Sequence, residues 1–432
     1  MIDSRPITAP EIYPIGTIDF PRMEITALEN GATLHAYNGG DQDLLRIGIY
    51  FQGGSREVGV VEQSLCLATL TEGAVGIDGD DIADILDFNG ARIATRCHSH
   101  YTGIELTVLN SRLSSVLPVM SKIVSRPSFP VQAIKIAATR AAAQLRLARE
   151  QVMTLAFEGF IALMAGKNHP AAFQPTEKDY LDCDRDTLVE TWSKIATAKS
   201  CHVFVAGKIN GNDMTLIKQF VLELPTSPSS DLSIKPYIAQ KPQVLVTEHA
   251  GSLQNAIMAG MPTINRNSPD YANLRLSIMA LGGYFGSRLM SNIREEKGLT
   301  YGISASLAAS VDAAYISINA QCNCSYTDEV IRETAKEMNL LKTNPPTGDE
   351  LSRLKAYAAT QLLKSFESPV SIMSQYISQL VVGIPAGYFE EQQKAIDSLT
   401  GDIIAACASK YINTDELRIS IGGEASSTLI HI

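Results

Sequence analysis

Long apolar runs are missing from this sequence. Its longest apolar stretches, such as residues 65–70 and 256–261, fall far short of the roughly 20 residues that cross a bilayer, so no membrane span is expected. The N-terminus has no cationic start followed by an apolar stretch, which predicts no secretory signal. Basic residues are not in excess either. Lys and Arg total 36 against 46 Asp and Glu, a formal charge of −10, and this disfavours a nucleic-acid partner.

Cysteine is scarce and unevenly placed. Seven cysteines are scattered over 432 residues, and an odd, scattered set is not a disulfide framework. Cys322 and Cys324 would share one face of a strand, but no second pair completes a zinc site. We therefore expect reduced thiols, a cytoplasmic location and no cofactor.

The familiar catalytic motifs are also missing. The sequence has no H-E-x-x-H, H-x-x-E-H or G-x-S-x-G, and its glycine-rich stretches at 53–54 and 282–286 do not continue as phosphate-binding loops. His98 and His100 could chelate a metal from one face of a strand. Glu105 is a poor third ligand, so the favoured interpretation of this pair is a solvent-facing strand end.

What the sequence does contain is enough apolar material for more than one domain. Apolar residues make up 45% of the chain, and its length predicts at least two domains. A Pro- and Ser-rich break at 224–231 lies near the midpoint. We therefore predict a first domain over 1–222, a linker over 223–242 and a second domain over 243–432.

The two halves have the same predicted layout. The first reads as a strand at 44–51, helices at 61–71 and 80–89, strands at 92–96 and 103–109, and helices at 114–125 and 131–148. The second reads as a strand at 256–260, helices at 271–281 and 287–296, strands at 300–307 and 314–320, and helices at 327–341 and 347–366. Residues 104–108 align with 316–320 and 141–145 with 358–362. The sequence thus predicts an α+β fold of two duplicated domains, each a mostly antiparallel sheet with helices packed on one face.

Residues 281–302 form the most informative segment. The spacing predicts a helix with Leu289 and Ile293 turned inward, Lys297 in its last turn, and Gly298 at its C-terminal end before a strand. Within it stand Gly-Gly, Ser-Arg-Leu and Ile-Arg-Glu-x-x-Gly-Leu-x-Tyr. This pattern resembles the second-domain signature of the pitrilysin-like zinc peptidases, the family of insulinase and the mitochondrial processing peptidase. The resemblance implies the LuxS/MPP-like metallohydrolase-type fold.

In the first half, the resemblance implies a Gly-Ser-Arg followed by a helix that carries H-x-x-E-H. Gly-Ser-Arg stands at 54–56, but the motif itself is degenerate. In one register its ligand and base positions are Ser64, Leu67 and Ala68, and in the other it falls on 62–66; neither register contains a histidine or keeps the glutamate base. Without imidazole ligands zinc has no cage and no water is activated, so we expect no metal site and no catalytic residue.

The resemblance still implies a role in peptide handling. In paired enzymes of this family, the subunit without zinc supplies an Arg and a Tyr to substrate carbonyls near the partner's metal, and Arg294 and Tyr301 occupy those positions here. The family's substrate also adds as a strand beside the segment after the Asn-Gly turn, which points to Arg92, Ile93, Ala94 and Thr95. Arg288, by contrast, reads as a structural residue.

Three hypotheses follow. The first is a non-catalytic subunit that contributes peptide-binding residues to a zinc-bearing pitrilysin-like partner in a heterodimer. The alternative is a structural or peptide-binding protein with no proteolytic role, as a homodimer or in a larger assembly, like the respiratory core subunits of the same fold. The third is an enzyme whose chemistry has moved to His98, His100 or Cys66.

The degenerate motif makes a direct prediction. The purified chain alone will cleave no peptide substrate and will hold no stoichiometric zinc, because residues 64–68 contain no histidine or carboxylate and a single cysteine cannot form a zinc cage. Metal analysis together with a peptide-hydrolysis assay checks this. Stoichiometric zinc or cleavage by the lone chain would contradict it.

Overall fold

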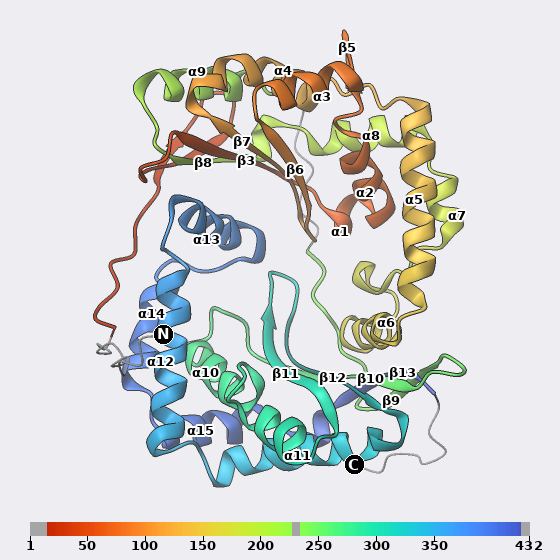
Figure 1. Cartoon of the computed structure of the whole chain (residues 1–432), viewed down its shortest axis with the longest axis vertical. Coiled ribbons are helices and arrows are strands. Elements are labelled where there is room, and N and C mark those ends of the chain that lie inside the picture. The colour runs from red at the N-terminus through yellow and green to blue at the C-terminus, as the bar shows by residue number, and fades with distance from the viewer. Residues whose placement is uncertain (1–14, 227–233, 425–432) are drawn as a thin grey trace, which may run out of the picture.

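The computed structural model describes residues 15–226 and 234–424 (Figure 1). The predicted break at 224–231 lies mostly outside these residues. The last helix before it ends at Leu222 and the next strand begins at Val244. No helix in the described ranges is long and apolar enough to cross a membrane.

The first half surrounds a sheet of apolar strands with helices, as the alternation of the two patterns predicts. Its elements are β1 (Glu24–Ala27), β2 (Thr33–Asn38), β3 (Leu44–Gln52), α1 (Ser55–Val58), α2 (Val60–Thr69), β4 (Gly73–Ala74), β5 (Ile77–Asp78), α3 (Gly79–Phe88), β6 (Arg92–Cys97), β7 (Tyr101–Leu109), η1 (Asn110–Arg112), α4 (Leu113–Ser125), α5 (Val131–Arg149), α6 (Val152–Ala165), η2 (Pro170–Ala172), α7 (Glu177–Leu181), α8 (Arg185–Ile195), η3 (Ala198–Ser200), β8 (Cys201–Gly207) and α9 (Gly211–Leu222).

The second half repeats this arrangement. Its elements are β9 (Val244–Glu248), β10 (Gln254–Pro262), α10 (Tyr271–Gly282), the π-helical η4 (Met290–Glu296), β11 (Thr300–Ala309), β12 (Ala314–Asn323), η5 (Cys324–Tyr326), α11 (Thr327–Thr343), α12 (Gly348–Lys364), α13 (Pro369–Val382), α14 (Tyr388–Ser398), α15 (Gly401–Tyr411), η6 (Thr414–Glu416) and β13 (Arg418–Gly423).

The two main sheets have the same topology. Across the described residues the first runs β1-β2-β8-β3-β7-β6, and the second, written in the matching direction, runs β9-β13-β10-β12-β11. The parallel pair is β2 with β8 in one sheet and β9 with β13 in the other, and the remaining neighbours are antiparallel. The predicted fold class of two duplicated, mostly antiparallel α+β domains is confirmed. The edge strands β6 and β11 occupy equivalent places.

Each half buries one sheet face under its own helices. In the first half, Ile47 and Val205 of the sheet share a core with Leu65 of α2. In the second, Ile318 of β12 and Leu274 of α10 lie in the corresponding core. This is the one-faced packing that the alternating strand pattern predicts.

The opposite sheet faces are covered by helices exchanged between the halves. α6 leaves the first half and packs on β10 and β13 of the second sheet, where Phe160 and Met164 bury Met258. In return, α13 of the second half packs under the first sheet, where Met373 and Ile377 lie against Phe204 (Figure 1). Neither exchanged helix was predicted from the sequence, because each covers a face of a sheet whose strands are distant from it in the chain.

A glycine makes one of these contacts possible. Gly422 of β13 faces the start of α6, and a Cβ there would collide with the Val152 carbonyl oxygen. Only glycine lets the helix backbone approach the strand this closely.

The halves also meet through a buried ion cluster at the tips of two equivalent hairpins. Asp312, in the β11–β12 turn, faces His100, in the β6–β7 turn, with Oδ2 3.3 Å from Nε2. The other imidazole nitrogen of His100 lies 2.6 Å from Glu57 of α1, and the Arg56 Nε lies 3.4 Å from Asp312. Arg56 also donates to the Tyr237 hydroxyl at 3.2 Å. We call Arg56, Glu57, His100 and Asp312 the clasp.

The clasp is charged at neutral pH. Burial alone would lower the pKa of His100, but the carboxylates of Asp312 and Glu57 more than offset this and raise that pKa to about 9. Burial would likewise raise the pKa of Asp312, but His100, the Ser310 hydroxyl and Arg56 lower it to about 2. The contact therefore persists unchanged across the physiological range.

These shifts predict a loss of stability in alkali. A raised folded-state pKa makes the His100 contribution complete below the unfolded value of about 6.5 and lost as pH rises through about 9. Between pH 6.5 and 10 the native chain should lose roughly 1–3 kcal/mol more unfolding free energy than His100→Gln. Urea unfolding at a series of pH values measures this, and Asp312→Asn should fall between the native chain and His100→Gln because Glu57 still faces the imidazole. Parallel pH profiles for all three proteins would contradict it.

Candidate functional site

Helix α2 holds the positions that correspond to the degenerate zinc motif. Ser64 is half-buried, and its hydroxyl donates to the Val61 carbonyl at 2.9 Å. Leu67 is 5% exposed and belongs to the first core, whereas Ala68 is exposed. In the other register, Cys66 is buried with its thiol directed to the Leu188 carbonyl. Neither register presents a set of metal ligands.

The same helix is tied to the sheet through Gln63, which the sequence did not mark. Its amide donates to the Tyr101 carbonyl at 3.0 Å and to the Thr102 hydroxyl at 2.8 Å. These bonds fix α2 beside the start of β7. The scaffold around the zinc-motif helix is therefore kept although the ligands are not.

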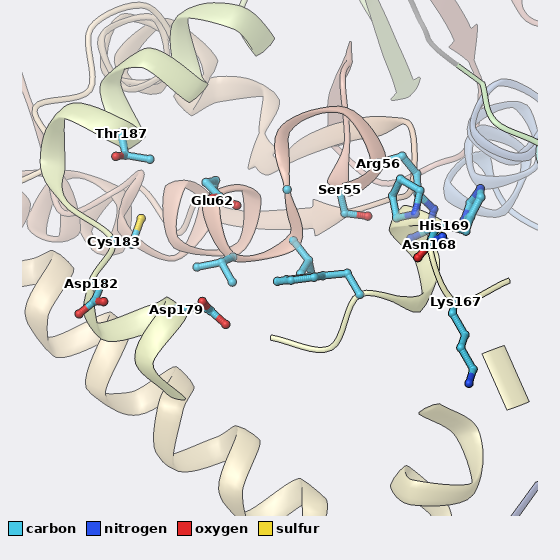
Figure 2. Close-up of a pocket in the computed structure, with 15 residues that line it drawn as sticks. Ser55, Arg56, Glu62, Lys167, Asn168, His169, Asp179, Asp182, Cys183 and Thr187 are labelled. Carbon is cyan, nitrogen blue, oxygen red and sulfur yellow. The ribbon is translucent and has the colours of Figure 1, made fainter. Parts of the chain in front are cut away.

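A cavity of about 710 Å³ lies along the exposed side of α1 and α2 (Figure 2). One end carries the acidic and thiol side chains of Glu62, Asp179, Asp182 and Cys183; the other end carries Arg56 and the 167–169 segment. Burial raises the pKa of the Cys183 thiol to about 11, so it is protonated at neutral pH. Among the described residues no three His, Cys, Asp or Glu side chains form a group that could hold a metal ion.

The segment predicted to accept a peptide forms β6, at the edge of the first sheet. It pairs with β7 on one side, and within the described chain no strand pairs with its other side. Arg92 is exposed, and Ile93, Ala94 and Thr95 are half-buried. An open strand edge of this kind offers unpaired backbone groups to an extended peptide.

Glu105 holds the sheet face next to this edge. Opposite Ala94, it accepts hydrogen bonds from Arg46 at 2.6 Å and Tyr50 at 2.7 Å, and it pairs with Arg96 at 2.8 Å. With these partners it is unavailable as a metal ligand.

The two histidines of the His98-Ser99-His100 turn have separate surroundings. The His98 ring lies 5.9 Å from that of Tyr50, and burial lowers its pKa. His100 is 1% exposed and sits in the clasp. The interpretation of this pair as a solvent-facing strand end is therefore wrong for His100. The second half covers the turn, and no local pattern reports a contact made across 212 residues.

Arg294 and Tyr301 come together at one cavity of about 600 Å³ in the second half. Leu289 and Ile293 anchor this segment in the core, as predicted, and Gly298 turns the chain with φ +64°. The guanidinium of Arg294 lies over the Phe285 ring, 4.9 Å from its centroid, and Tyr301 is 88% exposed.

The structural role predicted for Arg288 agrees with its contacts, whereas two aromatic residues near Arg294 were not predicted. Arg288 pairs with Glu350 through two bonds, of 2.8 and 3.1 Å, which suits the structural role expected for it. Tyr326, which lines the cavity, and Phe285, which contacts Arg294, were not singled out. An aromatic residue inside the glycine-rich turn was a usable signal for Phe285, but nothing in the sequence marks Tyr326.

The structure does not bring the two predicted binding regions together. No residue of β6 lines the cavity of Arg294 and Tyr301. Tyr301 is the second residue of β11, whereas the contact with the first half lies just beyond the other end of this strand, which is eight residues or about 26 Å away (Figure 1). Within one chain, the open edge of β6 and Tyr301 therefore lie at different parts of the molecule.

Comparison with known proteins bears on the fold and the family. Residues 182–357 match the family model described as the peptidase M16 inactive domain. The chain has the fold of the peptidase M16 inactive domain from Pseudomonas fluorescens, with a TM-score of 0.85 and 23% identity over 94% of this chain and 99% of that one. The resemblance to the pitrilysin-like (peptidase M16) family is thereby confirmed. The matched family model is described as an inactive domain, and the zinc-motif positions on α2 hold Ser64, Leu67 and Ala68.

Two further proteins are similar to this pitrilysin-like chain. A protease from Helicobacter pylori shares its fold at a TM-score of 0.82, with 15% identity over 94% of this chain and all of that one. An uncharacterized zinc protease of Streptomyces coelicolor is 24% identical over 122 residues, which span 28% of this chain and 27% of that protein.

The environment of Cys66 predicts an unreactive thiol. Burial raises its pKa well above the ordinary value, and its side chain has no access to solvent. Iodoacetamide at neutral pH should leave Cys66 unlabelled in the folded protein while the exposed Cys97 is labelled, as peptide mass spectrometry would show. The unfolded chain, labelled at both positions, is the control. Labelling of Cys66 ahead of Cys97 would support the relocated thiol chemistry.

Proposed function

We propose that this chain is the non-catalytic subunit of a two-chain zinc peptidase and contributes peptide-binding residues to a zinc-bearing pitrilysin-like partner. One observation carries the proposal. Arg294 and Tyr301 reach solvent at a cavity of their own half, and no residue of α2 or β6 lines that cavity. This accessibility supports a role for them on a substrate held by another chain.

The chemistry of the two side chains suits this task. A guanidinium and a phenol both donate hydrogen bonds, and such donors stabilise a carbonyl oxygen that gains negative charge during attack at the partner's metal. The chain's own α2 supplies no ligand or base, so the activated water has to come from the partner.

The open edge of β6 supports a second contact with the peptide. An extended segment can add beside Arg92, Ile93, Ala94 and Thr95 through backbone hydrogen bonds, which tolerate many sequences. Ile93 packs against the first core, so the strand is held rigidly while its backbone edge stays open.

The sequence left open whether the chain forms a homodimer or a heterodimer, and the two differ in whether a zinc-bearing subunit is present. A homodimer of this chain brings no zinc motif, so it can bind peptides without cleaving them. A heterodimer with a chain that carries H-x-x-E-H can cleave them. We further propose a cytoplasmic location, which the seven free cysteines support.

Reconstitution tests this proposal. A zinc-bearing chain of the same family, sought first in the neighbouring gene, is mixed with the native chain, Arg294→Ala, or Arg353→Ala. Arg353 is an exposed arginine away from the cavity and serves as the control. Mixing with the native chain should restore hydrolysis, and Arg294→Ala should lower kcat/KM roughly 10- to 100-fold because one charged donor is lost.

Two other outcomes would contradict this proposal. Full activity of the mixture with Arg294→Ala would remove Arg294 from the mechanism. Stable peptide binding with no gain of hydrolysis from any partner would instead establish the structural or peptide-binding alternative.

A further inference from the structure

We infer that the cavity of Arg294 and Tyr301 selects peptides by a carboxylate; this inference rests on the proposed function and names the ligand chemistry of that site. We call the cavity, lined among others by Gln254, Arg294, Tyr301, Gln321, Asn323 and Tyr326, the Arg294 groove. Its charge and its hydrogen-bonding state both point to an anion.

Arg294 is the one charged side chain that lines the groove among the described residues, and no acidic group lines it. No ion pair of Arg294 occurs within the described part of the chain. Its acidic neighbour Glu296 lines a different cavity, with Lys336. A guanidinium without a counter-ion favours an anionic ligand, because the ligand supplies the missing charge.

Several neutral polar atoms of the groove are already paired. Gln321 donates to Gln254 at 2.9 Å, and the Thr300 hydroxyl donates to the Gln321 carbonyl at 2.6 Å. The Asn323 side-chain oxygen accepts from Ser325. Arg294 and the hydroxyls of Tyr301 and Tyr326 have no hydrogen-bond partner among the described residues. The open donors thus include one cation and two phenols, beside the neutral side-chain amides of Gln254 and Asn323.

The contact with Phe285 orients the cation. The guanidinium carbon of Arg294 lies over the Phe285 ring, 4.9 Å from its centroid, and the N–H groups of Arg294 make no hydrogen bond within the described chain. Two parallel in-plane donors match the two oxygens of a carboxylate. One positive charge also matches one carboxylate, whereas a phosphate dianion would need a second cation.

The carboxylate has two sources in a peptide, the free C-terminus and an Asp or Glu side chain. Four labelled peptides of one neutral sequence separate them: free acid, C-terminal amide, amide with one internal Glu, and amide with Gln at that position. Fluorescence anisotropy gives the Kd of each for the native full-length chain, Arg294→Gln and Arg353→Gln. Arg353 is again the control, and melting curves check that each variant is folded.

A preference of about tenfold or more for either carboxylate peptide over its neutral match is expected for the native chain and Arg353→Gln. The pair that shows the preference identifies the source. Arg294→Gln should abolish this preference, so that each carboxylate peptide binds no more tightly than its neutral match. Equal Kd values for all four peptides, or a preference that survives Arg294→Gln, would overturn the carboxylate inference and leave peptide binding intact. Absence of binding by every peptide would overturn the peptide-binding proposal and, with it, this inference.

Discussion

The architecture depends on each half covering a sheet face of the other. A sheet with helices on one side leaves an apolar face exposed, and Phe204 and Met258 show that both faces are apolar here. α6 and α13, at equivalent places in the duplicated halves, close these faces in exchange. Because the exchange is reciprocal, neither half is complete alone, and the relative orientation of the sheets follows from it.

That orientation decides what each edge strand can do. The clasp joins the hairpins of β6 and β11 at their turns, so the strands extend away from one another. The residues at their far ends then face different surroundings. A peptide on the β6 edge and a ligand in the Arg294 groove are therefore separate events for one chain, which gives a physical reason for a partner.

The departure from the zinc motif is local, while the frame around it persists. Leu67 belongs to the hydrophobic core, and the Ser64 hydroxyl donates a hydrogen bond to a carbonyl of its own helix. At these positions α2 therefore contributes packing, whereas a zinc-binding helix carries metal ligands there. Gln63 still fixes the helix to β7. The second-half segment has kept Arg294 and Tyr301 accessible, and accessible aromatic and arginine side chains are common where binding energy is concentrated.

The sequence by itself determined the duplicated α+β fold, the inward Leu289 and Ile293, and the absence of zinc ligands on α2. Each of these follows from spacing along a single element or from residue identity, which local periodicity records. Only the tertiary structure decided the helix exchange, the burial of His100 against Asp312 and the unpaired state of Arg294. These depend on which surfaces meet across some 200 residues, where no repeating pattern links the partners, so charge and burial become known only once both halves are in place.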